Sequence, residues 1–286
     1  MEKGHKLKLN ILKRIQETRK IILSEKNFKP VIAIIAGSGL GEISLQFDIR
    51  KVIKYSKIPY FPKATAPGHA GELLLCSYKG VDLLIFNGRF HYYEGHSPQD
   101  VIYYVRVMKF LGIKTLVLTA AVGALKKKYS VGDIVILKDH IDFTGNSPLI
   151  GSNFEEFGDR FPNMENVYDY VLRKKALNIA KKFNIKAKNG VYFGVSGHAY
   201  ETPASVKAYR MLGGDVVGMS VVYEATAAAH MKFKILGLAY VSNMASEIND
   251  KPLSHEEVLA EGEKVSESLA KIIKHMIPFI VDKGAL

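Results

Sequence analysis

The stretch VIAIIAGSGLG, residues 31–41, joins an apolar run to a glycine-rich turn. Its first six residues, Val31–Ala36, are rich in β-branched side chains, which is typical of a strand covered on both faces. The glycines that follow allow the chain to turn sharply where that strand ends. Further apolar runs of similar length indicate more strands: Glu72–Cys76, Val81–Phe86, Lys114–Thr119, Ile134–Leu137, Gly190–Val195, Val216–Met219 and Ile235–Val241.

Helical patterns precede and separate these runs. A helix is expected at about 7–27, where Ile11, Ile15, Thr18 and Ile22 form one stripe. Two more are predicted at Ser97–Leu111 and Thr202–Leu212, because each has proline near its start and glycine after its end. The pattern S-x-x-E at Ser254–Glu257 is a capping box that begins a last helix. The apolar face of that helix contains Val258, Val265, Leu269, Ile272 and Met276.

The alternation of strands and helices predicts an α/β fold with a mixed, mostly parallel central sheet flanked by helices. We find no internal repeat and no linker, so residues 1–286 are interpreted as a single domain. The least structured stretch is Asp142–Asn163, which is rich in Gly, Asn, Phe and Pro. A loop of that length in a compact domain usually serves a function.

Composition excludes several classes of protein. With 48% hydrophobic and 24% charged residues, the chain is neither disordered nor collagen-like. No apolar run is long enough for a membrane span, and the N-terminus has no secretory pattern. One cysteine allows no intramolecular disulfide, which suits a cytoplasmic location. The net charge of +12 is scattered along the chain and no nucleic-acid motif accompanies it, so a solvated basic surface that attracts small anions is expected.

Polar side chains recur where the predicted strands end. Ser38, Arg89, Ser220 and Asn243 each follow an apolar run, and substrates of open α/β sheets bind at this edge. Arg89 offers a planar fork for a phosphate, and His91, oriented by Glu94, offers a second donor. The segment Thr119–Ala124 has small residues that expose backbone N–H groups. Each motif alone has a plainer interpretation: a tight turn, a surface ion pair, close strand packing, or, for Glu201, a carboxylate at a helix start.

Taken together, these segments resemble the trimeric purine nucleoside phosphorylases, a family that includes the methylthioadenosine phosphorylases. The resemblance covers roughly Val31 to Lys274. It rests on GSGLG, PGHAG, GRFHYYEG, VGDIVILKDHI, GDRFPNM, YET, VGMS, SN and SHEEVL, which occur in family order.

The resemblance implies a site with three parts. Phosphate would be bound by Ser38, His69, Arg89, His91, Ser220 and the backbone N–H of Ala121. Ribose would contact Tyr93, Met219 and His255. The base would lie against Tyr200, Glu201, Val217 and Asn243. Phe161 would cap the site of a neighbouring subunit in a homotrimer. The residues expected to be catalytic are Asn243, Glu201 and His91.

The reaction implied is the reversible phosphorolysis of a purine (deoxy)ribonucleoside to free base and (deoxy)ribose 1-phosphate, in purine salvage. Catalysis then consists of positioning plus electrostatic stabilisation of the leaving base. Asn243 is expected to donate to N7 and serve position 6, while Glu201 accepts from N1–H. The resemblance links Asn243 to 6-oxopurines, so inosine and guanosine are the expected substrates. Orthophosphate is a co-substrate, and no metal, other cofactor, membrane or nucleic-acid partner is expected.

The chain departs from the family pattern near the pocket. Ala120, Val122 and Ala124 add methyl groups or remove a polar side chain in a segment that is usually Asn-Ala-Ala-Gly-Gly. Tyr200 adds a hydroxyl to the usual Phe, and Ser242 replaces the usual Thr. Two alternatives therefore stay open: a methylthioadenosine phosphorylase, which Asn243 and His255 disfavour, and a catalytically silent homologue that binds nucleosides or nucleic acid.

Overall fold

The first apolar run forms the centre of the molecule. The computed structural model describes residues 2–66, 68–246 and 255–282. Strand β1 (Ile32–Ala36) is completely buried and pairs in parallel with β4 (Val81–Asn87) and β5 (Thr115–Ala124). Its side chains alternate between two apolar clusters: Ala33 and Ile35 belong to one, and Ile32 and Ile34 to the other. The run is continuously apolar because helices cover both faces of the sheet.

The described strands form one sheet in the order β2-β3-β4-β1-β5-β8-β7-β6-β9, and β9 also pairs with β5. β5 therefore has β8 (Val216–Gly218) beside its last residues and β9 (Lys234–Met244) along its whole length. Together with β6 (Ile134–Asp142) and β7 (Ala187–Gly194), these strands close a ring. Five of the nine described pairings are parallel and four are antiparallel, so the sheet is mixed as expected.

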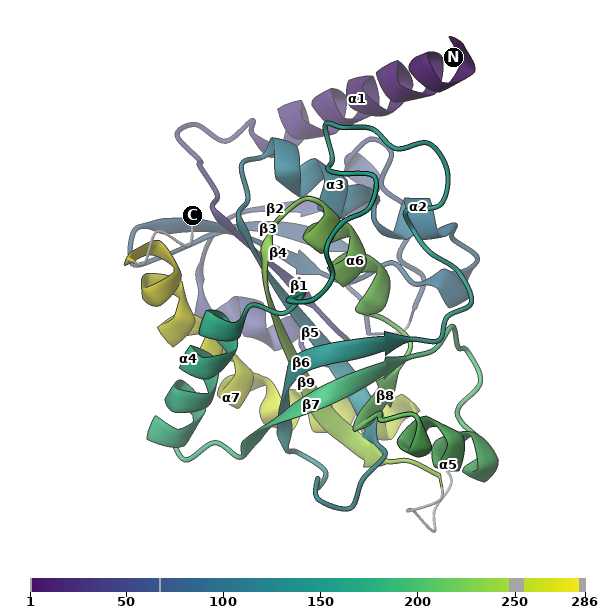
Figure 1. The fold of residues 1–286 in the computed structure, drawn as a ribbon. Helices are drawn as coiled ribbons and strands as arrows, with labels where there is room; N and C mark the ends of the chain where they lie inside the picture. Colours follow the sequence, from purple (N-terminus) through teal and green to yellow (C-terminus); the bar gives the residue numbers. More distant parts are fainter. Residues whose placement is uncertain (1, 67, 247–254, 283–286) are drawn as a thin grey trace.

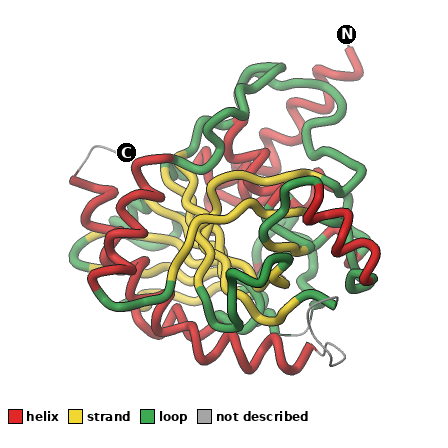
Figure 2. Tube along the Cα trace, turned by 60° about the horizontal axis from the view of Figure 1, so that its bottom comes forward, coloured by secondary structure: helices red, strands yellow, loops and turns green. Residues whose placement is uncertain are grey.

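Helices surround the strands, as Figure 2 shows. One apolar cluster lies under α1 (Glu2–Ile22), α3 (Tyr103–Phe110) and α6 (Val222–His230). The other lies under α4 (Tyr170–Lys182) and α7 (His255–Asp282), which pack together on the opposite face (Figure 1). The expected core face of α7 is confirmed, because the five predicted side chains are all buried. No helix in the described ranges is both long and apolar enough to cross a lipid bilayer.

Several boundaries differ from those expected. The N-terminal helix ends at Ile22, not near residue 27, and its predicted stripe does face the core. The helix expected at Ser97–Leu111 is two helices, α2 (Pro98–Val101) and α3, because Ile102 leaves the helical conformation. α5 (Pro203–Met211) begins after Thr202, whose side chain accepts the N–H of Ser205 as a cap. Ser254, the first residue of the expected capping box, lies outside the described residues.

Three elements were not expected from the sequence. β2 (Asp48–Lys54) pairs only with β3 (Glu72–Tyr78) and has one buried residue, so it lacks a continuous apolar run. α4 and α6 were also missed, although the cap of α4 is visible in the sequence as Asp169, which accepts the N–H of Leu172. Short 3₁₀ turns lie at Gly41–Gln46, Tyr55–Lys57 and Tyr92–Glu94. The loop expected at Asp142–Asn163 is present but shifted: Asp142 is the last residue of β6, and residues 143–169 contain no helix or strand.

Candidate active site

The ends of six strands meet at one pocket. It is lined by 16 residues, of which the sequence predicted 11: Ser38, Arg89, His91, Tyr93, Ala121, Tyr200, Glu201, Val217, Met219, Ser220 and Asn243. These residues come from turns after β1, β4 and β7 and from β5, β8 and β9. The remaining lining residues are Val122, Gly123, Gly218, Ser242 and Val258.

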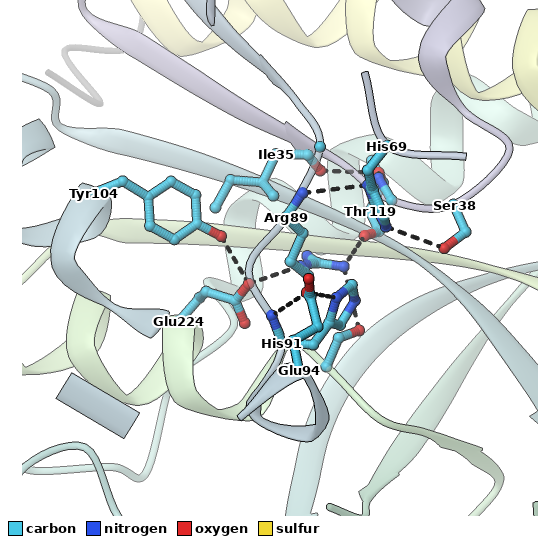
Figure 3. A network of polar contacts seen from close by, with 12 residues as sticks. Ile35, Ser38, His69, Arg89, His91, Glu94, Tyr104, Thr119 and Glu224 are labelled. Atoms are coloured by element: carbon cyan, nitrogen blue, oxygen red, sulfur yellow. Dashed lines mark hydrogen bonds and ion pairs between the residues drawn. The ribbon is translucent and has the colours of Figure 1, made fainter. Parts of the chain in front are cut away.

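Arg89 is the centre of the polar end of this pocket, and its side chain is almost completely buried (Figure 3). Its Nε contacts Glu224 Oε1 at 2.7 Å, and its Nη1 donates to Thr119 O at 2.9 Å and Ser220 Oγ at 3.2 Å. Its Nη2 is buried and has no hydrogen-bond partner among the described residues. A buried donor without a partner is costly, so this atom indicates a missing acceptor.

Glu224 holds Arg89 in place. Tyr104 donates its hydroxyl to the same carboxylate oxygen, at 2.9 Å, and Glu224 and Tyr104 are both buried. Burial of Arg89 opposes its charge, but the neighbouring Glu224 carboxylate outweighs this and raises the pKa of Arg89. The guanidinium therefore carries a positive charge in a dry environment and is fixed by Glu224, Thr119 and Ser220.

His91 is oriented by Glu94, as the sequence predicted. Glu94 Oε1 lies 2.9 Å from His91 Nδ1 and accepts the His91 N–H at 2.8 Å. Its second oxygen accepts from the N–H and hydroxyl of Thr65 and from the N–H of Ala66. Burial alone would raise the pKa of Glu94, but these bonds lower it to about 2. Burial lowers the pKa of His91, so Glu94 orients the imidazole without keeping it charged at neutral pH.

His69 does not line the pocket but supports two residues that do. Its Nδ1 accepts the backbone N–H of Arg89 at 3.2 Å, and its Nε2 lies 3.3 Å from Ser38 Oγ. Because Nδ1 is the acceptor, Nε2 of a neutral imidazole bears the proton and donates to the Ser38 hydroxyl. His69 therefore belongs to the same network (Figure 3), in contact with two residues that line the pocket.

Ser220 is presented by a strained turn. The next residue, Val221, has φ 71° and ψ −51°, which a β-branched residue rarely adopts. The Val222 N–H donates to Ser220 O at 2.8 Å and closes the turn. The Ser220 N–H donates to the hydroxyl of Tyr192, at 3.0 Å, and Tyr192 is fully buried. Strain of this kind persists only where the surroundings enforce it, commonly at functional sites.

The other end of the pocket carries an amide and a carboxylate. The Asn243 side chain lies over Gly123, where an added Cβ would approach its Nδ2 to 3.2 Å. Burial raises the pKa of Glu201 above that of an ordinary glutamate. Tyr200 is exposed and stands next to Glu201 in the chain. The pocket thus combines hydrogen-bond donors for an anion, around Arg89, with the amide of Asn243 and the carboxylate of Glu201.

Most of the chain matches known proteins. Residues 31–278 match the model of the Phosphorylase superfamily. The chain is 43% identical to purine nucleoside phosphorylase 1 of Bacillus subtilis, over 92% of this chain and 97% of that protein. It is 38% identical to the purine nucleoside phosphorylase of Bos taurus, over 94% and 96% of the two chains. The chain belongs to the purine nucleoside phosphorylase family.

Solved structures of this family agree. A purine nucleoside phosphorylase of Schistosoma mansoni in complex with adenosine has a TM-score of 0.87 and 37% identity, covering 93% of this chain and 96% of that one. Isoform 2 from the same organism, in complex with cytosine and ribose-1-phosphate, has a TM-score of 0.88 and 39% identity, covering 93% and 95%. A Schistosoma phosphorylase in complex with guanosine has a TM-score of 0.84 and 36% identity, covering 93% and 96%.

Of the predicted site residues whose side chains are described, His69 and Phe161 are not among those that line this pocket. Phe161 is 87% exposed and lies in the long loop. The side chain of His255, the first residue of α7, is outside the described part of the structure. In the described residues, no group of three His, Cys, Asp or Glu side chains is placed to hold a metal ion.

Sequence reasoning missed the supporting residues of this phosphorylase. Glu224, Tyr104 and Tyr192 do not touch the open part of the pocket, yet they fix Arg89 and Ser220. Glu224 is 135 positions from Arg89, so no local pattern connects the two. The only available signal was a glutamate, Glu224, in an otherwise apolar helix, four residues after Ser220.

Proposed function

We propose that this phosphorylase cleaves 6-oxopurine ribonucleosides and deoxyribonucleosides, with orthophosphate, to free base and (deoxy)ribose 1-phosphate. The observation that carries the proposal is Arg89, a buried and charged guanidinium that lines a pocket together with the amide of Asn243 and the carboxylate of Glu201. An anion and a purine are the two groups that this combination suits.

Phosphate is assigned to the end with Arg89. Ser38, His91, Ser220 and the backbone N–H of Ala121 would donate to its oxygens, and His69 would act through Ser38. The contacts between Arg89 and Ser220 and between His69 and Ser38 support this grouping. No metal is needed for this binding, because a charged guanidinium and neutral donors suffice for an anion.

Ribose is assigned to the middle of the pocket. The ring of Tyr93 stacks on that of His91, with centroids 4.5 Å apart, and would place an apolar face against the sugar. Met219 also lines the pocket and would contact the same sugar. His255 would bind the 5′-hydroxyl, by its position at the start of α7.

The base is assigned to Asn243 and Glu201, with Tyr200 and Val217 against its faces. A phosphate oxygen attacks C1′ while the C1′–N9 bond breaks, and the electron pair of that bond leaves with the purine. Asn243 would donate to N7 and serve position 6, and Glu201 would accept from N1–H, so negative charge on the base is stabilised where it grows.

Assembly and location are further parts of the proposal. We propose a homotrimer in which Phe161 caps a neighbouring subunit's site; its exposed ring, on a long loop, supports this assignment. The single cysteine, Cys76, is buried and free, which supports a cytoplasmic enzyme of purine salvage.

Two measurements test the assembly. Light scattering of the wild type gives the subunit number. Phe161→Ala should raise KM for nucleoside without changing the melting temperature.

The deciding experiment measures release of base from inosine and guanosine with and without orthophosphate. We expect release only with phosphate, together with formation of ribose 1-phosphate. Release without phosphate would indicate a hydrolase, and no release from correctly folded protein would indicate a nucleoside-binding homologue. Methylthioadenosine at equal concentration is the matched control, and we expect it to be cleaved far more slowly.

A further inference from the structure

The hydroxyl of Tyr240 joins two segments of the pocket wall. It lies 3.0 Å from the backbone carbonyl oxygen of Ser38 and 3.0 Å from that of Val258. Ser38 stands in the turn after β1 and Val258 belongs to α7, and both residues line the pocket. Tyr240 is not among the lining residues, so it can act on a ligand only through these two segments.

Tyr240 is a rigid support for this contact. It is completely buried in β9, where it pairs with Ala121 of β5 on one side and Ile134 of β6 on the other. Burial raises the pKa of Tyr240, and the nearby Glu261 carboxylate raises it further, so the hydroxyl keeps its proton. A tyrosine hydroxyl has one proton, and the two equidistant carbonyl oxygens share it. This sharing lasts only while the turn and α7 keep their present separation.

Glycines at two positions allow the turn and α7 to approach so closely. Gly39, in the turn, has φ 72°, and a Cβ there would come within 3.0 Å of Gly262 Cα in α7. A Cβ on Gly262 would come within 2.7 Å of the Tyr240 hydroxyl and 2.8 Å of Gly39 Cα. Glycine in a helix interior normally lowers stability, so Gly262 indicates a packing requirement. That requirement is the contact with the turn and the access of the hydroxyl to Val258 O.

The two joined segments serve different substrates in the proposed function. Ser38 is assigned to phosphate, and its side-chain hydroxyl is supported by His69 Nε2 at 3.3 Å (Figure 3). α7 begins at His255, which is assigned to the 5′-hydroxyl of the nucleoside, and Val258 follows three residues later in the pocket wall. Tyr240 therefore connects the part of the pocket for phosphate to the part for nucleoside through two backbone carbonyl groups.

We propose that Tyr240 is a positioning residue that couples the two substrates, so that phosphate and nucleoside each strengthen the binding of the other. The inference rests on the proposed function. The first substrate to bind fixes its own segment and, through the shared hydrogen bond, the other segment as well. The second substrate then has less of the pocket to order. By thermodynamic linkage, the two substrates tighten each other by the same factor.

The test measures inosine binding by calorimetry with and without sulfate. Sulfate has the shape and charge of the phosphate dianion but is a far weaker nucleophile, and chromatography after the titration verifies that inosine is intact. Sulfate is kept well above its inhibition constant against phosphate, so that its site is filled. We expect sulfate to lower the Kd for inosine about tenfold in the wild type and about twofold in Tyr240→Phe, a difference that corresponds to roughly one hydrogen bond.

Tyr129→Phe is the matched control. Tyr129 is also buried, and its hydroxyl donates to a backbone carbonyl oxygen, that of Asn189 at 2.8 Å, outside the pocket. Both variants should have a lower melting temperature, and only Tyr240→Phe should lose the effect of sulfate. If sulfate tightens inosine equally in the wild type and in Tyr240→Phe, the Tyr240 hydroxyl is only structural and the inference is overturned.

A second variant alters the same contact from α7. Gly262→Ala keeps the Tyr240 hydroxyl, but the added methyl group must displace it or the turn. Alanine is the better helix former, so α7 itself is not weakened. We expect Gly262→Ala to reduce the effect of sulfate as Tyr240→Phe does, with no further loss in the double variant because both changes break one contact. Additive losses would contradict a common origin.

The wild type alone separates this inference from the proposed function. If inosine is cleaved with phosphate but sulfate leaves its Kd unchanged, the coupling is wrong and the proposed function stands. If inosine is neither bound nor cleaved, the proposed function itself is wrong.

Discussion

The two ends of the pocket are built differently. At the phosphate end, Arg89 and His91 are each held by a buried or hydrogen-bonded carboxylate. At the base end, Asn243 is held by neutral groups: the Ser242 hydroxyl donates to its Oδ1, and its Nδ2 donates to Met244 O. Hydrogen bonds that involve a charged group are stronger than those between neutral groups. Substitutions should therefore have their largest effects at the phosphate end.

The largest effect is expected for Arg89→Ala. It removes the charged donor and should lower kcat/KM for phosphate about a thousandfold, the scale for loss of a preorganised charged group in a dry site. Arg106→Ala is a matched control: Arg106 is also largely buried, but it stacks on Phe157, with its guanidinium carbon 5.0 Å from the ring centroid and away from the pocket. The assignment of Arg89 fails if both variants have equal KM for phosphate.

A smaller loss is expected when the support of Arg89 is weakened. Glu224→Gln keeps the shape but removes the charge, and should raise KM for phosphate about tenfold because the guanidinium is less well fixed. Tyr104→Phe removes one hydrogen bond to Glu224 and should raise KM for phosphate about threefold.

A buried carboxylate elsewhere provides the control for Glu224. Asp215 pairs with Lys126 and Lys128, each at 2.9 Å. Asp215→Asn should lower the melting temperature and leave KM for phosphate unchanged. If Glu224→Gln behaves in the same way, Glu224 is merely structural.

The pH dependence should separate the carboxylates of the two ends. The pKa of Glu94 is about 2, so the phosphate end keeps its negative partner throughout the working range. Glu201 must be ionised to accept N1–H, and burial raises its pKa, so this function is lost on acidification at a pH above that of an ordinary glutamate. We expect kcat/KM for inosine to be constant above that pKa and to fall about tenfold per pH unit below it.

The variant Glu201→Gln tests the origin of that acid limb. It should turn over inosine slowly and show no decline where the wild type declines. An unchanged limb in the variant would assign the titration to phosphate or to His91.

An effect as small as that of Tyr104→Phe is expected for Tyr192→Phe, which removes the acceptor of the Ser220 N–H. KM for phosphate should rise about threefold, because Ser220 loses a bond that holds its turn. Tyr129→Phe is the control, since the Tyr129 hydroxyl donates to Asn189 O outside the pocket. Both variants should have a lower melting temperature, and only Tyr192→Phe should change KM for phosphate.

Much of the site could be predicted because its residues follow local patterns. Arg89, Ser220 and Asn243 stand directly after apolar runs, and the ends of neighbouring strands in such a sheet converge on one pocket. Glu94 could be assigned to His91 because three positions separate them, which is within reach of a turn. Phe161 could not be placed by any pattern in this chain, because its proposed contact lies on another subunit.

The sequence by itself determined which runs are strands, because full burial demands apolar side chains, and it determined which end of those strands carries polar groups. Only the tertiary structure decided that β5 is shared by β8 and β9 and closes a ring, and that Glu224 meets Arg89. β2 likewise became a strand only through pairing with β3, since an exposed edge strand needs no apolar run. The polarity of each side chain indicates whether that residue is buried, so burial can be predicted from the sequence. A contact between residues more than a hundred positions apart forms only when the sheet has formed.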